Sequence, residues 1–136
     1  MKMNRLFQHY EGSIDDLSGS RFSCVKSIED ELNGNVILLW MKDDISQYWY
    51  RLFIDGVYCG VDRYSEDKSS EDMDDDILCL DRSQWFTGKI LQSAKVFCFN
   101  EKNRYISLIM NFGESEFQFC CRSEDGDCEL LFYTDK

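Results

Sequence analysis

The sequence predicts a mainly β protein: a β-rich α+β fold in which two antiparallel meanders pack as a sandwich or a rolled sheet, with one or two short helices. Three observations predict it. Apolar and polar residues alternate with period two in several segments, short polar turns separate these segments, and aromatic residues make up 15% of the chain. The composition is even along all 136 residues, so we expect a single domain, residues 1–136, that buries its own core.

The first meander is expected in the N-terminal half of the chain. Residues 22–28 and 36–41 have the composition of strands, and a turn at Asn33-Gly34 lies between them. Residues 36–41 are apolar enough to be buried on both faces of a sheet.

The strongest hairpin signal is Asp55-Gly56, which lies between the apolar segments 48–54 and 57–64. A type I′ turn needs positive φ at both central residues, and Asp-Gly supplies it. This turn pairs Ile54 with Val57 and gives the hairpin one apolar face. The opposite, mixed face carries Trp49, Arg51, Phe53, Tyr58, Asp62 and Tyr64.

The second meander is expected in the C-terminal part of the chain. Four segments there alternate apolar and polar residues, and polar turns separate them. The four segments are residues 94–99, 104–112, 116–122 and 128–134.

The remaining segments are not expected to be strands. Residues 4–17 are expected to hold a short helix and a loop, and residues 83–93 a helix capped by Ser83, although Gly88 weakens it. An acidic loop, residues 65–76, separates the two groups of strands. Trp40 and Trp85 are assigned to the core.

Sequence motifs for catalysis and for cofactor binding are missing. His9 is the single histidine, and no nucleophile motif accompanies it. The cysteines lack the paired spacing of a zinc site, the acids at 72–76 lack the glycine of a calcium loop, and phosphate-binding glycine motifs do not occur. We therefore expect no enzyme, no catalytic residue, no metal and no cofactor. With 26 carboxylates, spacing cannot single out a catalytic pair, so a carboxylate enzyme stays an open alternative.

Composition also predicts the compartment. Seven cysteines without regular spacing, and an N-terminus without a secretory signal, favour reduced thiols and a cytoplasmic location. The longest apolar run, residues 36–41, is too short to span a membrane. A net charge of −11 repels nucleic acids and anionic membranes and attracts a basic partner.

Negative charge is concentrated in two zones. Residues 66–76 carry a net charge of −6, and residues 114–129 a net charge of −5. Because Tyr and Trp are typical anchors of protein interfaces, the mixed hairpin face extends this candidate surface. The alternative is that the acids are merely solvated and the aromatics cover a second core layer. The predicted partner-binding residues are Glu66, Asp67, Glu71, Asp72, Asp74, Asp75, Asp76, Trp49, Tyr58, Tyr64, Glu124, Asp125 and Asp127.

Two acidic stretches, SEDKSSEDMDDD and ESEFQFCCRSEDGDCE, occur in a small, aromatic-rich β chain that has no catalytic motif. A resemblance to a known class of proteins rests on this combination of size, charge and composition. The chain resembles the small acidic immunity proteins that bacteria encode beside polymorphic or contact-dependent growth-inhibition toxins. The resemblance implies a tight 1:1 complex with a cognate toxin, often a basic nuclease, and a block of its active site or of an adjacent surface. No signature motif of one immunity family is present, so no family binding residues are carried over.

Two other functions fit the same composition. A small β-barrel can carry an apolar ligand in an interior cavity. A phage-type inhibitor can mimic a nucleic acid if its carboxylates are spaced like phosphates. A cavity in the interior would favour the carrier, whereas a solid interior with a charged exterior would favour the inhibitor.

Overall fold

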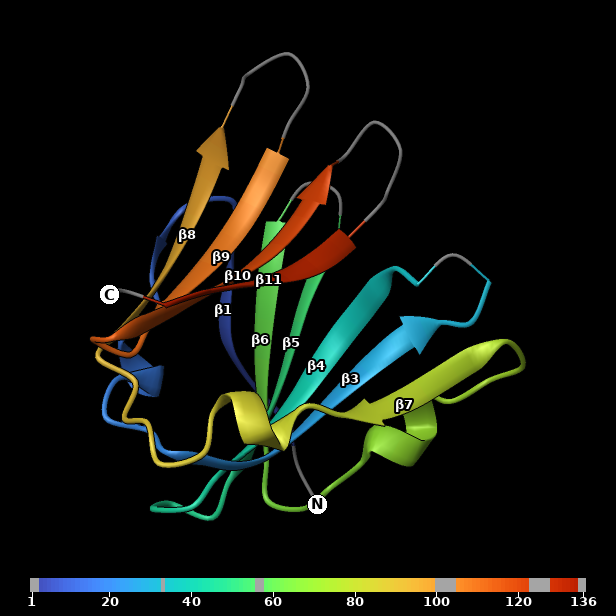
Figure 1. Cartoon of the computed structure of the whole chain (residues 1–136), viewed down its shortest axis with the longest axis horizontal. Coiled ribbons are helices and arrows are strands. Elements are labelled where there is room, and N and C mark those ends of the chain that lie inside the picture. Colours follow the sequence, from blue (N-terminus) through green and yellow to red (C-terminus); the bar gives the residue numbers. More distant parts are fainter. Residues whose placement is uncertain (1–2, 33, 56–57, 100–104, 123–127, 135–136) are drawn as a thin grey trace.

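We describe a computed structural model of the chain. The structure describes residues 3–32, 34–55, 58–99, 105–122 and 128–134. Their strands form two antiparallel sheets, and the helical residues among them are confined to short 3-10 turns, as expected of a mainly β protein. Figure 1 shows the two sheets as facing layers. Within the described ranges no helix has the length and apolar character needed to cross a membrane.

Sheet A has six strands in the order β1-β6-β5-β4-β3-β7. The consecutive strands β3 to β6 form the first predicted meander, and β1 and β7 are added at its two edges. The strands are β1 (Asn4–His9), β3 (Phe22–Asp30), β4 (Val36–Asp43), β5 (Trp49–Asp55), β6 (Tyr58–Tyr64) and β7 (Ile77–Asp81).

Sheet B has five strands in the order β11-β10-β9-β8-β2. The strands are β2 (Gly12–Ser13), β8 (Ser93–Phe99), β9 (Tyr105–Asn111), β10 (Ser115–Arg122) and β11 (Cys128–Thr134). Strands β8 to β11 are the second predicted meander. Only Tyr10 and Glu11 separate β1 in sheet A from β2 in sheet B, so the two sheets are joined at one corner.

The main core lies between the two sheets. In β5 the buried residues Tyr50, Leu52 and Ile54 alternate with half-buried ones, because successive side chains of a strand point to opposite faces. Phe117 and Phe119 of β10 enter the same core from sheet B. The connections complete it through Ile14, Leu17, Phe86 and Leu91.

The two predicted helices are shortened to single 3-10 turns. Residues 4–17 instead form β1, β2 and the 3-10 turn η1 (Asp15–Leu17). A β-bulge between Arg5 and Phe7 breaks the alternation of β1, so its sequence lacks a strand's period. Within 83–93 only η3 (Ser83–Trp85) is helical, and Gly88 follows at a φ of 76°, outside the right-handed helical region.

The hairpin of β5 and β6 has a different register from the predicted one. Ile54 pairs with Cys59 and Leu52 with Val61, two positions further along β6 than the Asp55-Gly56 turn predicts. Residues 56 and 57 lie outside the described residues. Because side chains alternate with period two, a shift of two positions leaves every residue on its predicted face. The apolar face is therefore the core face, and the mixed face points outward.

Trp40 is buried, as predicted, but not between the two sheets. Only 1% of its surface is exposed, and it belongs to a second cluster with Ile28 and Leu38 on the outer face of sheet A. Trp85 is half-buried and packs on the main core, where it stacks on Phe117. The outer face of sheet A thus has a small apolar core of its own.

Candidate partner-binding surface

The outer face of sheet A joins aromatic and charged side chains. Trp49, Arg51 and Phe53 point outward from β5 because their neighbours Tyr50, Leu52 and Ile54 fill the core. Across the ladder, Trp49 pairs with Tyr64 and Arg51 with Asp62. This is the mixed face that the sequence predicts.

The acidic loop, residues 65–76, is folded back onto this outer face. Its 3-10 turn η2 (Ser69–Asp72) carries the first anchor, Asp72. The Trp40 indole Nε1 donates to Asp72 Oδ2 at 2.7 Å. Arg51 donates to the same carboxylate through Nε at 3.1 Å and Nη2 at 3.0 Å. A two-point contact between guanidinium and carboxylate fixes orientation as well as distance, so it holds the loop in one position.

A second anchor lies at the start of the loop. The Lys26 Nζ of β3 forms an ion pair with Asp67 and contacts Ser69 Oγ at 3.3 Å. Burial alone would raise the pKa of Asp67, but the hydrogen bonds from Lys26 and Ser69 outweigh it and lower that pKa below its usual value. The Lys26 ammonium also lies 5.4 Å from the centre of the Trp49 ring, within range of a cation–π contact.

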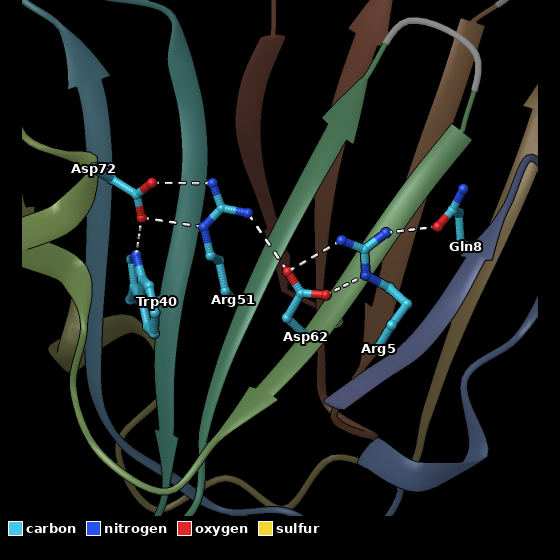
Figure 2. Close-up of polar contacts among 6 residues, drawn as sticks. All are labelled: Arg5, Gln8, Trp40, Arg51, Asp62 and Asp72. Carbon is cyan, nitrogen blue, oxygen red and sulfur yellow. Dashed lines mark hydrogen bonds and ion pairs between the residues drawn. The ribbon is translucent and has the colours of Figure 1, made fainter. Parts of the chain in front are cut away.

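Asp62 connects the anchored loop to the N-terminal strand. Its side chain is 2% exposed and pairs with Arg5 of β1 and, at 3.6 Å, with Arg51 Nη1. Figure 2 shows the resulting chain of contacts from Gln8 through Arg5, Asp62 and Arg51 to Asp72 and Trp40. Phe53 lies near both guanidinium groups, 5.2 Å from Arg5 and 4.9 Å from Arg51.

The carboxylates of the acidic loop therefore have different surroundings. Asp67 and Asp72 form ion pairs within the chain, Asp67 with Lys26 and Asp72 with Arg51. Glu66 pairs with Lys68 in an exposed contact. The other loop acids are exposed and enter no ion pair among the described residues; they are Glu71, Asp74, Asp75 and Asp76.

Two further acids join this group through the fold. The Glu31 backbone N–H donates to the Asp76 carbonyl at 2.8 Å, and Asp30 is the ladder partner of Ile77. The sequence prediction missed both residues, because they lie more than 30 positions before the loop and only the pairing of β3 with β7 brings them there. We call Asp30, Glu31, Asp74, Asp75 and Asp76 the acidic edge.

The predicted aromatic residues do not form one patch. Trp49 and Tyr64 are ladder partners beside the anchored loop, and both are half-buried. Tyr58 lies at the other end of β6, where its ring meets Phe53 edge to face at 6.0 Å. Tyr58 and Tyr64 are six positions apart along β6, a span of about 20 Å. Glu124, Asp125 and Asp127 lie outside the described residues.

The described residues of this face offer few groups that are placed for catalysis or for metal binding. No group of three or more His, Cys, Asp and Glu side chains among them is placed to hold a metal ion. The carboxylates of the network, Asp62 and Asp72, already pair with the guanidinium groups of Arg5 and Arg51 or with the Trp40 indole. The arrangement is suited to presenting fixed negative charge.

No protein-family model, no curated protein and no solved structure matches the chain.

Proposed function

We propose that this chain is an immunity-type inhibitor that binds a basic, nuclease-like toxin domain in a 1:1 complex through the acidic edge and the adjoining acidic loop. The observation that carries the proposal is the double anchoring of the loop. Asp67 and Asp72 hold it on sheet A, so Glu71, Asp74 and Asp75 are presented from a fixed base.

Anchoring matters because a mobile acidic loop must be ordered when a partner binds, and that ordering costs free energy. A loop already held by a two-point Arg51 contact avoids most of this cost. The exposed acids then form a constant negative field that accelerates the encounter with a positively charged protein.

The size of the surface is adequate for a stable complex. The chain exposes 7489 Å² in total. A standard interface covers about 800 Å² of each partner, which is roughly a tenth of this surface. We assign this contact to the acidic edge, the loop and the Trp49–Tyr64 side of sheet A.

The packing of the interior supports an inhibitor rather than an apolar-ligand carrier. Phe22, Phe86 and Phe117 are fully buried between the sheets and contact one another through Phe112. A pocket of about 360 Å³ at residues 88–90, 92 and 112–115 is open to the surface, and Lys89, Gln92 and Glu114 contribute polar groups to it. Such a lining is unsuited to an apolar ligand.

The test is capture followed by inhibition. The tagged protein is incubated with an extract of its own source cells at low and at high salt, and the retained protein is identified by mass spectrometry. That protein is then produced alone, and its activity on RNA and DNA is titrated with the chain. We expect a basic protein that salt releases and whose activity is lost at a 1:1 ratio.

Two variants with equal loss of charge provide the control. Glu71→Gln/Asp74→Asn/Asp75→Asn removes three exposed charges beside the acidic edge, and Glu11→Gln/Asp15→Asn/Asp16→Asn removes three exposed charges near η1. Figure 1 shows η1 and β7 on opposite sides of the molecule. The first variant should lose inhibitory strength and the second should retain it. Equal behaviour of the two, or a captured protein whose activity the chain does not change, contradicts the proposal.

A further inference from the structure

Strand β7 is an open edge of sheet A. It pairs with β3 on one side, and the sheet ends on its other side. The Arg82 N–H donates to Val25 at 2.8 Å and the Glu31 N–H to Asp76, so positions 76, 78, 80 and 82 direct their backbone groups toward β3. In an antiparallel ladder the alternate positions then direct theirs outward. Cys79 and Asp81 therefore present N–H and C=O groups at the open edge, and among the described residues no backbone group bonds to them.

Two of the other described edges, β1 and β2, are less suited to accept a strand. A β-bulge interrupts β1, and β2 has only two residues. Bulges and short length are the usual protection of a sheet edge, as is proline, and the chain contains no proline. The ladder of β7 has no register shift. Strand β11 is also an uninterrupted edge, and it serves below as the internal comparison.

The side chains of β7 define which strand would fit. Leu78 is 39% exposed and Leu80 half-buried, and both lie on the face toward the core. On the opposite face Asp81 is exposed at the end of β7, and the acidic edge lies at its beginning. An added strand would therefore place apolar residues beside Leu78 and Leu80 and basic residues beside Asp81 and Asp75.

Charge selects a partner strand over a second copy of this chain. A copy carries the same net charge of −11 and would bring its own Asp74–Asp76 segment to this edge. Like charges placed together across a contact disfavour association, whereas Lys and Arg side chains are attracted. A basic strand satisfies both the backbone groups and the carboxylates.

We propose that β7 binds its partner by strand addition: an extended segment of alternating basic and apolar residues continues sheet A beyond β7. This inference rests on the proposed function, because it states how the basic partner is held. Main-chain hydrogen bonds to Cys79 and Asp81 would supply affinity, and the acids at both ends of β7 would supply specificity.

The first experiment uses a synthetic probe and no toxin. A short peptide that alternates lysine and valine is added to ¹⁵N-labelled protein, and amide hydrogen exchange is followed by NMR. A peptide that alternates glutamate and valine is the charge control. We expect the lysine peptide alone to slow exchange at the Cys79 and Asp81 amides. Protection at β11 instead of β7, or no protection at about 1 mM peptide, overturns the proposal.

Two substitutions at one position separate the backbone group from the thiol. Cys79→Pro removes the outward N–H and leaves the bonds to β3 intact, because proline is tolerated at an outward edge position. Cys79→Ser keeps the N–H. The proline variant should bind the lysine peptide at least about tenfold more weakly, and the serine variant should bind it like the parent. Equal binding by both variants overturns the proposal.

The outcomes distinguish a failure of strand addition from a failure of the proposed inhibitor function. If Cys79→Pro folds, with an unchanged unfolding midpoint, and still neutralises the captured toxin as the parent does, strand addition is wrong and the inhibitor function stands. If β7 becomes protected as the protein concentration rises without peptide, the occupant is a second copy and strand addition by a basic partner is wrong. Loss of inhibition in Cys79→Pro but not in Cys79→Ser supports both proposals.

Discussion

The indole Nε1 of Trp40 donates a hydrogen bond of 2.7 Å to Asp72 Oδ2, and this bond ties a strand of sheet A to the acidic loop. A buried indole N–H needs an acceptor, since an unpaired buried donor costs free energy. The fold supplies that acceptor from a carboxylate 32 positions further along the chain. The burial of Trp40 and the position of the acidic loop therefore depend on each other.

This relationship predicts coupling between Trp40 and Asp72. Trp40→Phe removes the donor, and Asp72→Ala removes the acceptor and the Arg51 partner. Each should lower the free energy of unfolding by about 1–3 kcal/mol. The double variant should cost about 1 kcal/mol less than the sum, because the bond is lost only once. Urea unfolding of all four proteins measures this coupling. Trp40→Phe with Asp81→Ala, which does not contact Trp40, should be additive, and additivity in the first pair would contradict the anchor.

Alternation in the sequence was enough to predict most strands, their faces and the two-sheet fold. It failed where local features break the period. The prediction misses β1 because a bulge follows Arg5. Strand β7 lies outside the predicted strands, and its run Ile77-Leu78-Cys79-Leu80 does not alternate with period two. The hairpin register was wrong by two positions, yet the faces were right, since faces depend only on parity.

The candidate site was only partly predictable. The sequence indicated the acidic loop and the aromatic face as separate features, and charge counting treated all loop acids alike. Only the fold brings Lys26 and Arg51 to two of these acids and Glu31 to Asp76. Such pairings join residues from different strands, and spacing along the chain carries no signal for them.

Gly60 is expected to be intolerant of a side chain. A Cβ at this position would lie 2.6 Å from Cε1 of Phe53, whose ring covers the glycine from the neighbouring strand. Gly60→Ala should therefore cost about 1–3 kcal/mol in the free energy of unfolding. The same change in a Phe53→Ala background should cost much less, because the overlap is gone. An equal cost in both backgrounds, measured by urea unfolding, would show that Phe53 is not the obstacle.

Protonation of Asp43 is expected to account for part of the protein's loss of stability at low pH. Asp43 is 5% exposed. Burial alone would raise the pKa of its carboxyl group, but hydrogen bonds from Ser46, Arg21 and Ile45 outweigh burial and lower this pKa below 3.8. Because the native pKa is the lower one, protonation favours the unfolded chain. This contribution is present above the unfolded pKa and is lost as pH falls through the native one, between about pH 5 and pH 2. Asp43→Asn should show a shallower loss of stability in this range, and exposed Asp15→Asn should follow the parent. An unchanged slope in Asp43→Asn would contradict the assignment.

Cysteine reactivity should follow burial. Burial raises the pKa of the Cys59 thiol to about 12, and the residue is 0% exposed. Cys79 is exposed on β7. A thiol reagent at neutral pH should therefore label Cys79 in the native protein and Cys59 only after unfolding, because the thiolate is the reactive form. Peptide mapping by mass spectrometry distinguishes the two sites. Labelling of Cys59 at the same rate as Cys79 would mean that β6 opens in the native state.

Association with the basic partner should depend on the exposed acids and not on the anchors. Glu71→Gln/Asp74→Asn/Asp75→Asn should slow association roughly tenfold at low salt, with dissociation changed less, since surface charge acts mainly on the encounter. The difference should shrink at about 0.5 M salt, where the Debye length is only a few ångströms.

The unfolding temperature separates this effect from loss of the loop. It should stay unchanged in the triple variant, because none of its three side chains pairs with a cation in the described residues. Asp72→Asn should instead lower the unfolding temperature, since it weakens the Arg51 contact at 3.0 Å. Stopped-flow kinetics and thermal unfolding of both variants test this division. If the triple variant associates as fast as the parent at low salt, the acidic loop does not accelerate the encounter. This conclusion holds whatever the unfolding temperature of Asp72→Asn.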